Sequence, residues 1–165
     1  MPGIRLWLAG SGALQSDDVT EELHQAAAHL GVADKVRFLG AVSDVEQVLQ
    51  AADLFVFPSH REGMPNALIE AVTCGLPVIA SDIDGVRDVV GDEHIRFFPT
   101  GDTQALADAV LDAFASAQVT AIKADRARNH VEATFSLSSV ASRYEAVYRA
   151  LILNESLQTM QTRER

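Results

Sequence analysis

The sequence predicts an α/β fold, a doubly wound parallel sheet with helices packed on both of its faces. Short apolar runs alternate along the chain with longer stretches in which apolar residues recur at helical spacing. Glycine and proline separate many of these runs, which is typical of the turns between strands and helices. Strands that alternate with helices in this way pair in parallel, because each helix returns the chain to the same end of the sheet.

The expected strands are short runs rich in apolar, β-branched and aromatic residues: 4–10, 35–40, 54–58, 77–81 and 95–99. The first run ends in Gly-Ser-Gly, which indicates a turn. The third ends at Pro58, which has no N–H to donate to a neighbouring strand.

The expected helices fill the segments between and after the strands. Asp18 with Glu21 resembles a helix N-terminus, and Gly31 ends that helix. Ser43 with Glu46 forms a capping-box pattern that opens the next helix. The remaining helices are expected at about 66–74, 85–90, 103–116, 119–133 and 137–153. Residues 1–153 form the expected domain, and the polar end at 154–165 is expected to fray.

Composition limits the classes of function. The 165 residues suit one soluble domain, and the net charge of −10 opposes general binding to nucleic acid or to an anionic membrane. No apolar run approaches the ~20 residues of a membrane span, and no signal peptide is evident. Cys74 is the single cysteine and cannot form an internal disulfide, which suits a reducing compartment or a fold that needs no disulfide. Taken together, these features predict a cytoplasmic location.

The loop at 58–66 is the segment most suited to bind a ligand. In sheets of this kind ligands bind beyond the carboxyl ends of the strands, where Glu62 is expected to lie. Gly63 allows close approach of the backbone, and the unpaired N–H groups of the following helix form a site for an anion such as a diphosphate. Pro65 is expected at or near the first helical position, with Glu70 one turn further along.

An anion site flanked by carboxylates suits a ligand that carries both phosphate and hydroxyl groups, such as a nucleotide-sugar. The spacing alone leaves a simpler reading open and even favours it. In that reading Glu62 is a solvated loop residue, and Glu70 lies on an exposed helix face.

The segment FPSHREGMPNALIEAVTCGLPVIASDIDG resembles the signature of the retaining glycosyltransferases of the GT-B fold, family 4 type. The fixed positions of that signature are all present: Ser59, Glu62, Gly63, Pro65, Glu70, Ala71, Gly75, Pro77, Val78, Ile79, Ala80 and Ser81. Weaker similarity extends over most of residues 4–152, including LWLAGSG, VRFLGAVSDVEQVLQAADLFVFPS and FSLSSVASRYEAVYRAL.

The resemblance implies a role for each site residue. Glu62 corresponds to the carboxylate that meets the sugar close to the reacting carbon, and Glu70 to the one that binds the ribose. Backbone groups of the donor-binding segment would contact sugar and diphosphate, namely Gly63, Met64, Asn66 and Ala67. Val42 lies where family members contact the base through the main chain. The resemblance implies a metal-independent transfer with retention, with no cofactor beyond the nucleotide-sugar donor.

The chain also departs from the family pattern. Family members begin this domain with a strand–loop–helix unit that carries an Arg and a Lys for the diphosphate, and this chain starts after it. The usual Gly-x-Pro-Glu after the fourth strand is Gly-Val-Arg-Asp here, with Arg87 and Asp88 in place of the last two residues. We therefore expect a donor-binding domain whose acceptor-binding partner domain lies elsewhere in the parent protein, and no transferase activity from this chain alone.

Three other functions compete with this interpretation. A sugar phosphorylase needs a pyridoxal-binding lysine, and Lys35 and Lys123 are the only lysines, neither near the loops above. A glycosidase with Glu62 and Glu70 as its carboxylate pair leaves the phosphate-binding helix end unexplained. A non-catalytic module that binds a nucleotide-sugar remains an alternative. The acceptor, a glycan or a lipid-linked glycan, is open, and a parent protein peripheral at the membrane is compatible with the sequence.

Overall fold

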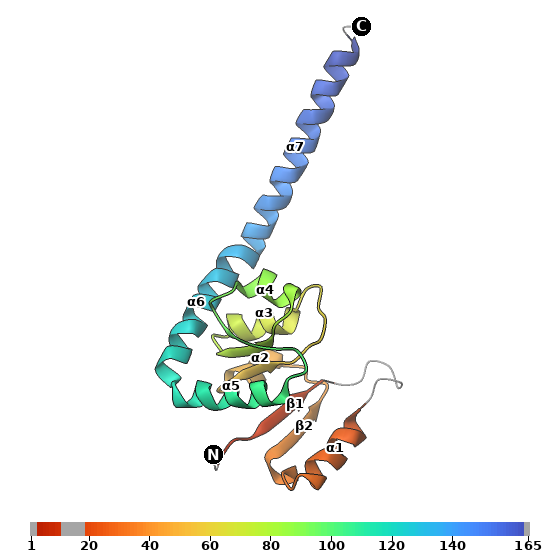
Figure 1. Cartoon of the computed structure of the whole chain (residues 1–165). Coiled ribbons are helices and arrows are strands. Elements are labelled where there is room, and N and C mark those ends of the chain that lie inside the picture. The colour runs from red at the N-terminus through yellow and green to blue at the C-terminus, as the bar shows by residue number, and fades with distance from the viewer. Residues whose placement is uncertain (1–2, 11–18, 164–165) are drawn as a thin grey trace. The chain divides into compact units, whose positions relative to one another are not determined.

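The computed structural model describes the backbone of residues 3–10 and 19–163, and the side-chain surroundings as far as Ile152 (Figure 1). The chain divides into two compact units, Met1–Gln47 and Val48–Arg165. Each unit has its own parallel sheet.

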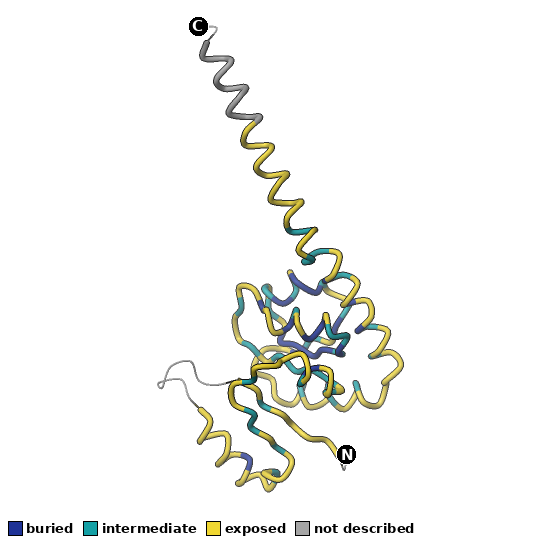
Figure 2. Tube along the Cα trace, turned by 180° about the vertical axis from the view of Figure 1, so that it is seen from behind, coloured by how far each residue is buried: buried dark blue, intermediate teal, exposed yellow. Residues whose placement is uncertain are grey.

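The first unit pairs two strands, β1 (Leu6–Ala9) and β2 (Val36–Gly40), in parallel. The chain between them forms α1 (Thr20–His29) and a short 3₁₀ turn, η2 (Ala33–Lys35). Beyond the end of β1, the Gly10 N–H donates to the Gly40 carbonyl over 2.8 Å and extends the ladder. Ala27 is the one buried residue in the described part of this unit, so its apolar core is small (Figure 2).

The end of α1 follows its glycine as predicted. Gly31 adopts a φ of +68°, which glycine reaches without strain. The N–H groups of Gly31 and Val32 donate to the carbonyls of Ala28 and Ala27, which closes the helix. At the other end Val19 is the N-cap residue and supplies no side-chain hydrogen bond, and the predicted Asp18 lies outside the described residues.

The helix α2 (Val45–Gln50) spans the boundary between the units, and its cap differs from the prediction. The carboxylate of Asp44, not the hydroxyl of Ser43, accepts from the Gln47 N–H over 3.1 Å. The Gln47 side chain also donates to Asp44, over 2.7 Å. The capping motif is therefore Asp-Val-Glu-Gln, shifted by one residue, because a capping residue bonds three positions ahead and the helix begins at Val45.

The second unit contains three parallel strands with β4 (Val78–Ser81) in the centre, β3 (Phe55–Phe57) on one side and β5 (Arg96–Phe98) on the other. Every residue of β4 is buried. Its helices are α3 (Asn66–Thr73), α4 (Asp84–Val90), α5 (Thr103–Ala115), α6 (Ala117–Phe135) and α7 (Leu137–Arg163).

Alternate residues of β4 face two different parts of the core. Val78 and Ala80 pack with buried residues of α3, α4 and α6, whereas Ile79 packs with Ala109 of α5. Successive side chains of a strand point to opposite faces of its sheet. The three-stranded sheet is therefore covered by helices on both faces, as predicted (Figure 1).

The predicted fold class is confirmed, and every described strand lies within a predicted run. The strands do not form one continuous ladder in the described chain, however. They pair as a two-stranded sheet and a three-stranded sheet.

The last helix is longer than predicted. α7 continues through Arg163, whereas the sequence predicts a helical end near residue 153, and the fraying of the polar end stays a prediction. Arg143 joins α7 to the end of α6, since it donates to the Thr134 carbonyl over 2.6 Å and lies 5.9 Å from the Phe135 ring centroid. The side chains beyond it are exposed as far as Ile152 (Figure 2).

No single helix in the described residues is long and apolar enough to cross a membrane. The two segments Thr103–Ala115 and Ala117–Ile152, bent by 102° at their junction, meet the same length and composition limits only when they are taken together.

Candidate functional site

Glu62 lies in the loop that connects the carboxyl end of β3 to α3, as the sequence predicts. Its side chain is half-buried, and the Ser59 hydroxyl donates to Glu62 Oε1 over 2.7 Å. This bond orients the carboxylate from within the same loop. A carboxylate held in this way can accept hydrogen bonds from a ligand or stabilise a positive charge that develops near it.

The backbone of Glu62 lies directly against the first turn of α4. A Cβ atom built on Gly85 would lie 2.3 Å from the Glu62 carbonyl oxygen and 3.1 Å from its carbonyl carbon. The loop after β3 and the helix after β4 therefore touch through their main chains at this point.

The loop after β5 also reaches the loop after β3. A Cβ on Gly101, whose φ is +81°, would lie 4.0 Å from His60 Cε1. The segments after all three strands of the second unit thus meet around residues 60–62. This agrees with the rule that ligand sites of parallel sheets form at the carboxyl edge.

The N-terminus of α3 is open to an anion. Pro65 is buried and is the N-cap residue, directly before the first helical residue Asn66. No side chain caps the helix. The Asn66 N–H donates to the Met64 carbonyl, while the Leu68 and Ile69 N–H groups donate to Pro65. No backbone carbonyl in the described chain accepts a hydrogen bond from the Ala67 N–H. That donor and the positive end of the helix dipole suit a phosphate or carboxylate.

The exposed face of α3 carries the other predicted residues. Asn66, Ala67 and Glu70 are exposed, and Glu70 lies four positions after Asn66 and three after Ala67, so its side chain is close to both on the helix surface. The buried residues Leu68, Ala71 and Val72 occupy the opposite side. Gly63 and Met64 are exposed in the preceding loop.

Val42 belongs to the first unit, where it follows β2 and is half-buried. The donor-binding roles of Val42 and of the α3 residues stay predictions.

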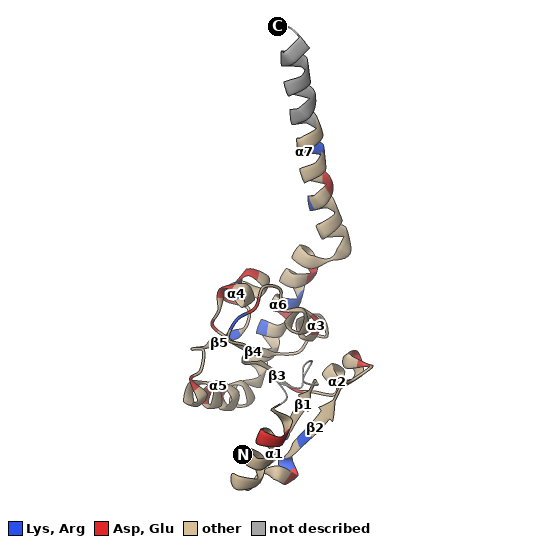
Figure 3. Cartoon of the chain, turned by 90° about the vertical axis from the view of Figure 1, so that its right-hand side faces the viewer, with Lys and Arg blue, Asp and Glu red and all other residues tan. Residues whose placement is uncertain are grey.

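Arg87 holds α4 in place through three partners. Its guanidinium donates to Asp82 through Nε (2.5 Å) and Nη2 (2.9 Å) and to Asp92 through Nη1 (2.5 Å), so it links the residues before and after the helix. The guanidinium carbon lies 4.5 Å from the centroid of the Phe97 ring. The hydrogen bond from Arg87 lowers the pKa of Asp82, and the bonds to Asp82 and then Asp92 raise the pKa of Arg87. Figure 3 shows the acidic residues on and around α4.

Sequence reasoning did not assign roles to Gly85, Arg87 or the hydroxyl of Ser59. Ser59 and Gly85 are both retained from the resembled motifs, which is the signal that marks them. Arg87 stands out only as a departure from that pattern, and its partner Asp92 lies outside the motif.

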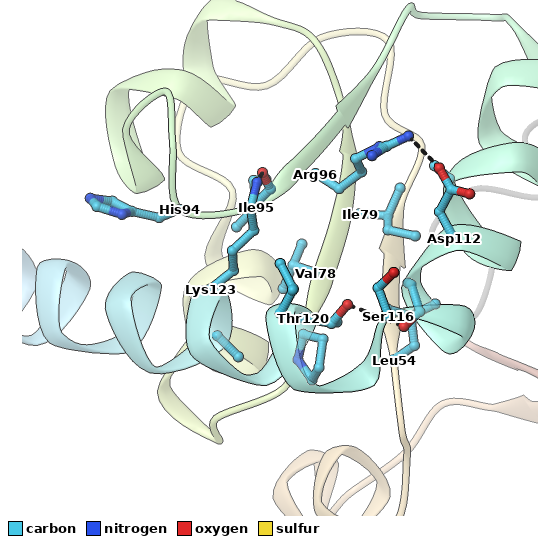
Figure 4. A pocket seen from close by; sticks show the side chains of 15 residues that line it. Leu54, Val78, Ile79, His94, Ile95, Arg96, Asp112, Ser116, Thr120 and Lys123 are labelled. Atoms are coloured by element: carbon cyan, nitrogen blue, oxygen red, sulfur yellow. Dashed lines mark hydrogen bonds and ion pairs between the residues drawn. The ribbon is translucent and has the colours of Figure 1, made fainter.

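A cavity of about 310 Å³ lies elsewhere in the second unit, at the amino ends of its strands. Leu54, Pro77 and Ile95, each next to the start of a strand, line it together with residues of α5 and α6 (Figure 4). Lys123 points to the Ile95 carbonyl over 3.4 Å, and Arg96 pairs with Asp112 over 2.8 Å. The cavity contains none of the predicted site residues, and it lies at the sheet edge opposite Glu62.

No group of three or more His, Cys, Asp or Glu side chains in the described residues is arranged to hold a metal ion. The candidate site therefore consists of one oriented carboxylate, an uncapped helix N-terminus and an exposed glutamate on the same helix. Such a site can bind the anionic part of a ligand at the N-terminus of α3 and place the Glu62 carboxylate beside the rest of that ligand.

Comparison with known proteins matches residues 1–116 to a family described as glycosyl transferases group 1. The chain is 30% identical over 145 residues to the lipopolysaccharide core biosynthesis glycosyltransferase LpsE of Rhizobium meliloti. The aligned residues make up 87% of this chain and 41% of LpsE. The chain is 33% identical over 158 residues to the D-inositol 3-phosphate glycosyltransferase of Mycobacterium marinum, covering 92% of this chain and 34% of that protein.

Among solved structures, the chain resembles the Anabaena protein Alr3699/HepE in complex with UDP-glucose. The TM-score is 0.84 at 26% identity, over 91% of this chain and 42% of that one. The chain thus spans less than half the length of each of these proteins.

Proposed function

Because this chain belongs to the group 1 glycosyl transferases, we propose that it is the donor-binding part of an enzyme that transfers a sugar from a nucleotide-sugar to a glycan or lipid-linked acceptor. The predicted kinship with GT-B glycosyltransferases is confirmed. The observation that carries the donor-binding role is the uncapped N-terminus of α3 directly after the loop that holds Glu62. The UDP-glucose complex of the Anabaena protein supports a nucleotide-sugar as the donor.

The proposed mechanism follows from the charges that develop as the sugar–diphosphate bond breaks. Negative charge grows on the leaving phosphate, where the dipole of α3 and the Ala67 N–H, which donates to no backbone carbonyl of the described residues, would stabilise it. Positive charge grows on the anomeric carbon, and the Glu62 carboxylate, oriented by Ser59, would stand beside it. These groups suffice for charge stabilisation without a metal, so we propose a metal-independent transfer without a further cofactor. Retention of configuration, the family 4 assignment and a cytoplasmic location are parts of the same proposal.

Glu70 has a different proposed role. It is exposed one turn inside α3, on the same face as Asn66 and Ala67. A ligand whose diphosphate lies at the helix N-terminus would extend along this face, and its ribose hydroxyls would donate to the Glu70 carboxylate. Backbone groups of Gly63 and Met64 would contact the sugar and diphosphate, and Val42 the base.

We also propose that the acceptor binds to a second domain of the parent protein, because the chain spans less than half the length of its relatives.

The division of labour between the two glutamates is tested in the two-domain parent. Glu62→Gln keeps the shape of the side chain but removes its charge, so kcat should fall by a factor on the order of 10², equivalent to ~2.7 kcal/mol at the barrier. Affinity for the bare nucleoside diphosphate, measured by calorimetry, should barely change because that ligand lacks the sugar. Glu70→Gln should instead weaken nucleoside diphosphate binding and raise KM.

Glu22→Gln, at an exposed position of α1, is the control and should leave both quantities unchanged. The assigned roles are reversed if Glu62→Gln loses diphosphate affinity while Glu70→Gln keeps it. If the parent binds nucleotide-sugars but transfers no sugar to any acceptor, the alternative of a non-catalytic binding module is correct. Sugar transfer by the isolated 165-residue chain would contradict the expected need for a second domain.

A further inference from the structure

Gly85 is unusual among the described glycines because any side chain there would overlap the backbone of another segment. A Cβ at this position would lie 2.3 Å from the carbonyl oxygen of Glu62, whereas the nearest atom to a Cβ on Gly91 or Gly101 would lie at 3.4 Å or 4.0 Å. At the other described glycines a Cβ would meet nothing within 4 Å. The overlap is with main-chain atoms, so no side-chain rotation can relieve it.

We propose that Gly85 is a positioning residue for Glu62. Its missing side chain lets the first turn of α4 lie against the Glu62 peptide group, and this contact determines where the Glu62 carboxylate stands. The inference rests on the proposed role of Glu62 in transfer. Glu62 is thus held at two points, at its carboxylate by Ser59 and at its backbone by α4.

The surroundings decide which partner moves when a side chain is added at Gly85. α4 is anchored by buried Val86, Val89 and Val90, and Arg87 ties it to Asp82 and Asp92. The loop is less constrained, because Arg61, Gly63 and Met64 are all exposed. An added methyl group therefore displaces Glu62, and α4 keeps its place.

Alanine isolates this steric effect from other consequences of replacing glycine. Gly85 is not among the glycines with positive φ, so alanine adopts its backbone conformation without strain. Alanine also favours a helix more than glycine does. A loss of function in Gly85→Ala thus reflects the contact with Glu62 and no defect of α4 itself.

The test compares Gly85→Ala with wild type in the two-domain parent. A displacement of about 1 Å at a reacting group can cost on the order of 10²-fold in rate, so kcat should fall by about that factor. Nucleoside diphosphate affinity should stay within about 2-fold, because the N-terminus of α3 is untouched. Ile95→Val is the matched control. It removes a buried methyl group at the opposite edge of the sheet without adding any atom beside Glu62, and should lower thermal stability while keeping kcat.

Two further variants make the outcome decisive. In the double mutant Gly85→Ala/Glu62→Gln, the alanine should add little to the effect of Glu62→Gln alone, because both act through one carboxylate. If Gly85→Ala does not fold, Arg87→Ala releases α4 from its two carboxylates and should lower kcat at unchanged diphosphate affinity.

The outcomes separate this inference from the proposed function. If Glu62→Gln leaves kcat unchanged, the proposed role of Glu62 fails. If Glu62→Gln lowers kcat and Gly85→Ala, once folded, does not, the positioning role of Gly85 is overturned. Unchanged kcat in Arg87→Ala overturns it in the case where Gly85→Ala cannot be purified.

Discussion

The hydroxyl of Ser81 is fully buried at the end of β4 and has no hydrogen-bond partner in the described residues. A buried hydroxyl that loses its bonds to water without gaining others destabilises the folded state. Its neighbours in β4 are apolar and buried, so the strand would pack equally well without it.

We predict that Ser81→Ala stabilises the protein by ~1 kcal/mol, the typical cost of one unsatisfied buried group. Urea denaturation followed by circular dichroism measures this change. Ala80→Ser is the matched control, since it adds a hydroxyl at the adjacent fully buried position and should destabilise the protein. A loss of stability in Ser81→Ala would mean that a buried water or other group satisfies the hydroxyl.

Residue-level predictions from the sequence succeed where the determinant is local. The positions of Glu62 in a loop and of Glu70 one turn into a helix follow from the pattern of apolar residues around Gly63 and Pro65. The contact between Gly85 and Glu62 does not follow, because α3 and β4 separate the two residues along the chain and only the packing of α4 joins them. The one-residue error at Ser43 and Asp44 arose because both residue types are good helix caps.

At the scale of single elements, α4 depends on the ion pairs that its residue Arg87 makes with Asp82 and Asp92. The hydrogen bond from Arg87 lowers the pKa of Asp82 below its ordinary value of 3.8. The pair therefore contributes fully to stability above that value, and its contribution is lost as the pH falls through the lowered pKa. Both side chains are more than a third exposed, so solvent screens the interaction.

We predict that Asp82→Asn reduces the loss of stability on acidification below about pH 4, because one fewer carboxylate must take up a proton on unfolding. Urea unfolding at neutral pH and at about pH 3 gives the free energy of unfolding of wild type and variant at each pH. The fall in this free energy between the two pH values is then compared between the two proteins. Asp88→Asn changes an exposed carboxylate of the same helix that makes no ion pair in the described residues, and should follow wild type. Equal acid sensitivity of Asp82→Asn and wild type would contradict the prediction.

The helix α7 shows the limit of periodicity as a guide to packing. Tyr144, Val147, Tyr148 and Leu151 recur at the spacing of a buried helical face, yet all four are exposed. Periodicity in the sequence correctly predicts a helix here, but it cannot tell which surface covers the apolar face.

We predict that amide hydrogen exchange at residues 144–152 is far faster than in α3, because an isolated helical segment without packed neighbours is only marginally stable in water. Arg143→Ala should extend fast exchange toward Leu137 by removing the bond to Thr134. The matched variant Arg149→Ala breaks only an exposed ion pair with Glu145 and should leave exchange near Leu137 unchanged. Slow exchange throughout 144–152 would show that this segment is packed against something.

At the scale of the whole molecule, the two units differ in how much apolar surface they bury. Both apolar clusters that include β4 belong to the second unit, whereas Ala27 is the one buried residue described in the first. The alternation of strands and helices predicts the fold class of the chain. It does not predict how strands pair, because pairing depends on segments far apart in sequence.

The division into units has an optical consequence. Trp7 is the only tryptophan of the chain and lies in β1, so its fluorescence reports on the first unit. Most helices belong to the second unit, which therefore dominates the far-ultraviolet circular dichroism. We predict that in urea the fluorescence transition precedes the dichroism transition, because the first unit buries less apolar surface. Coincident transitions would instead show that the two units unfold together, and one tryptophan would then report on the stability of the whole chain.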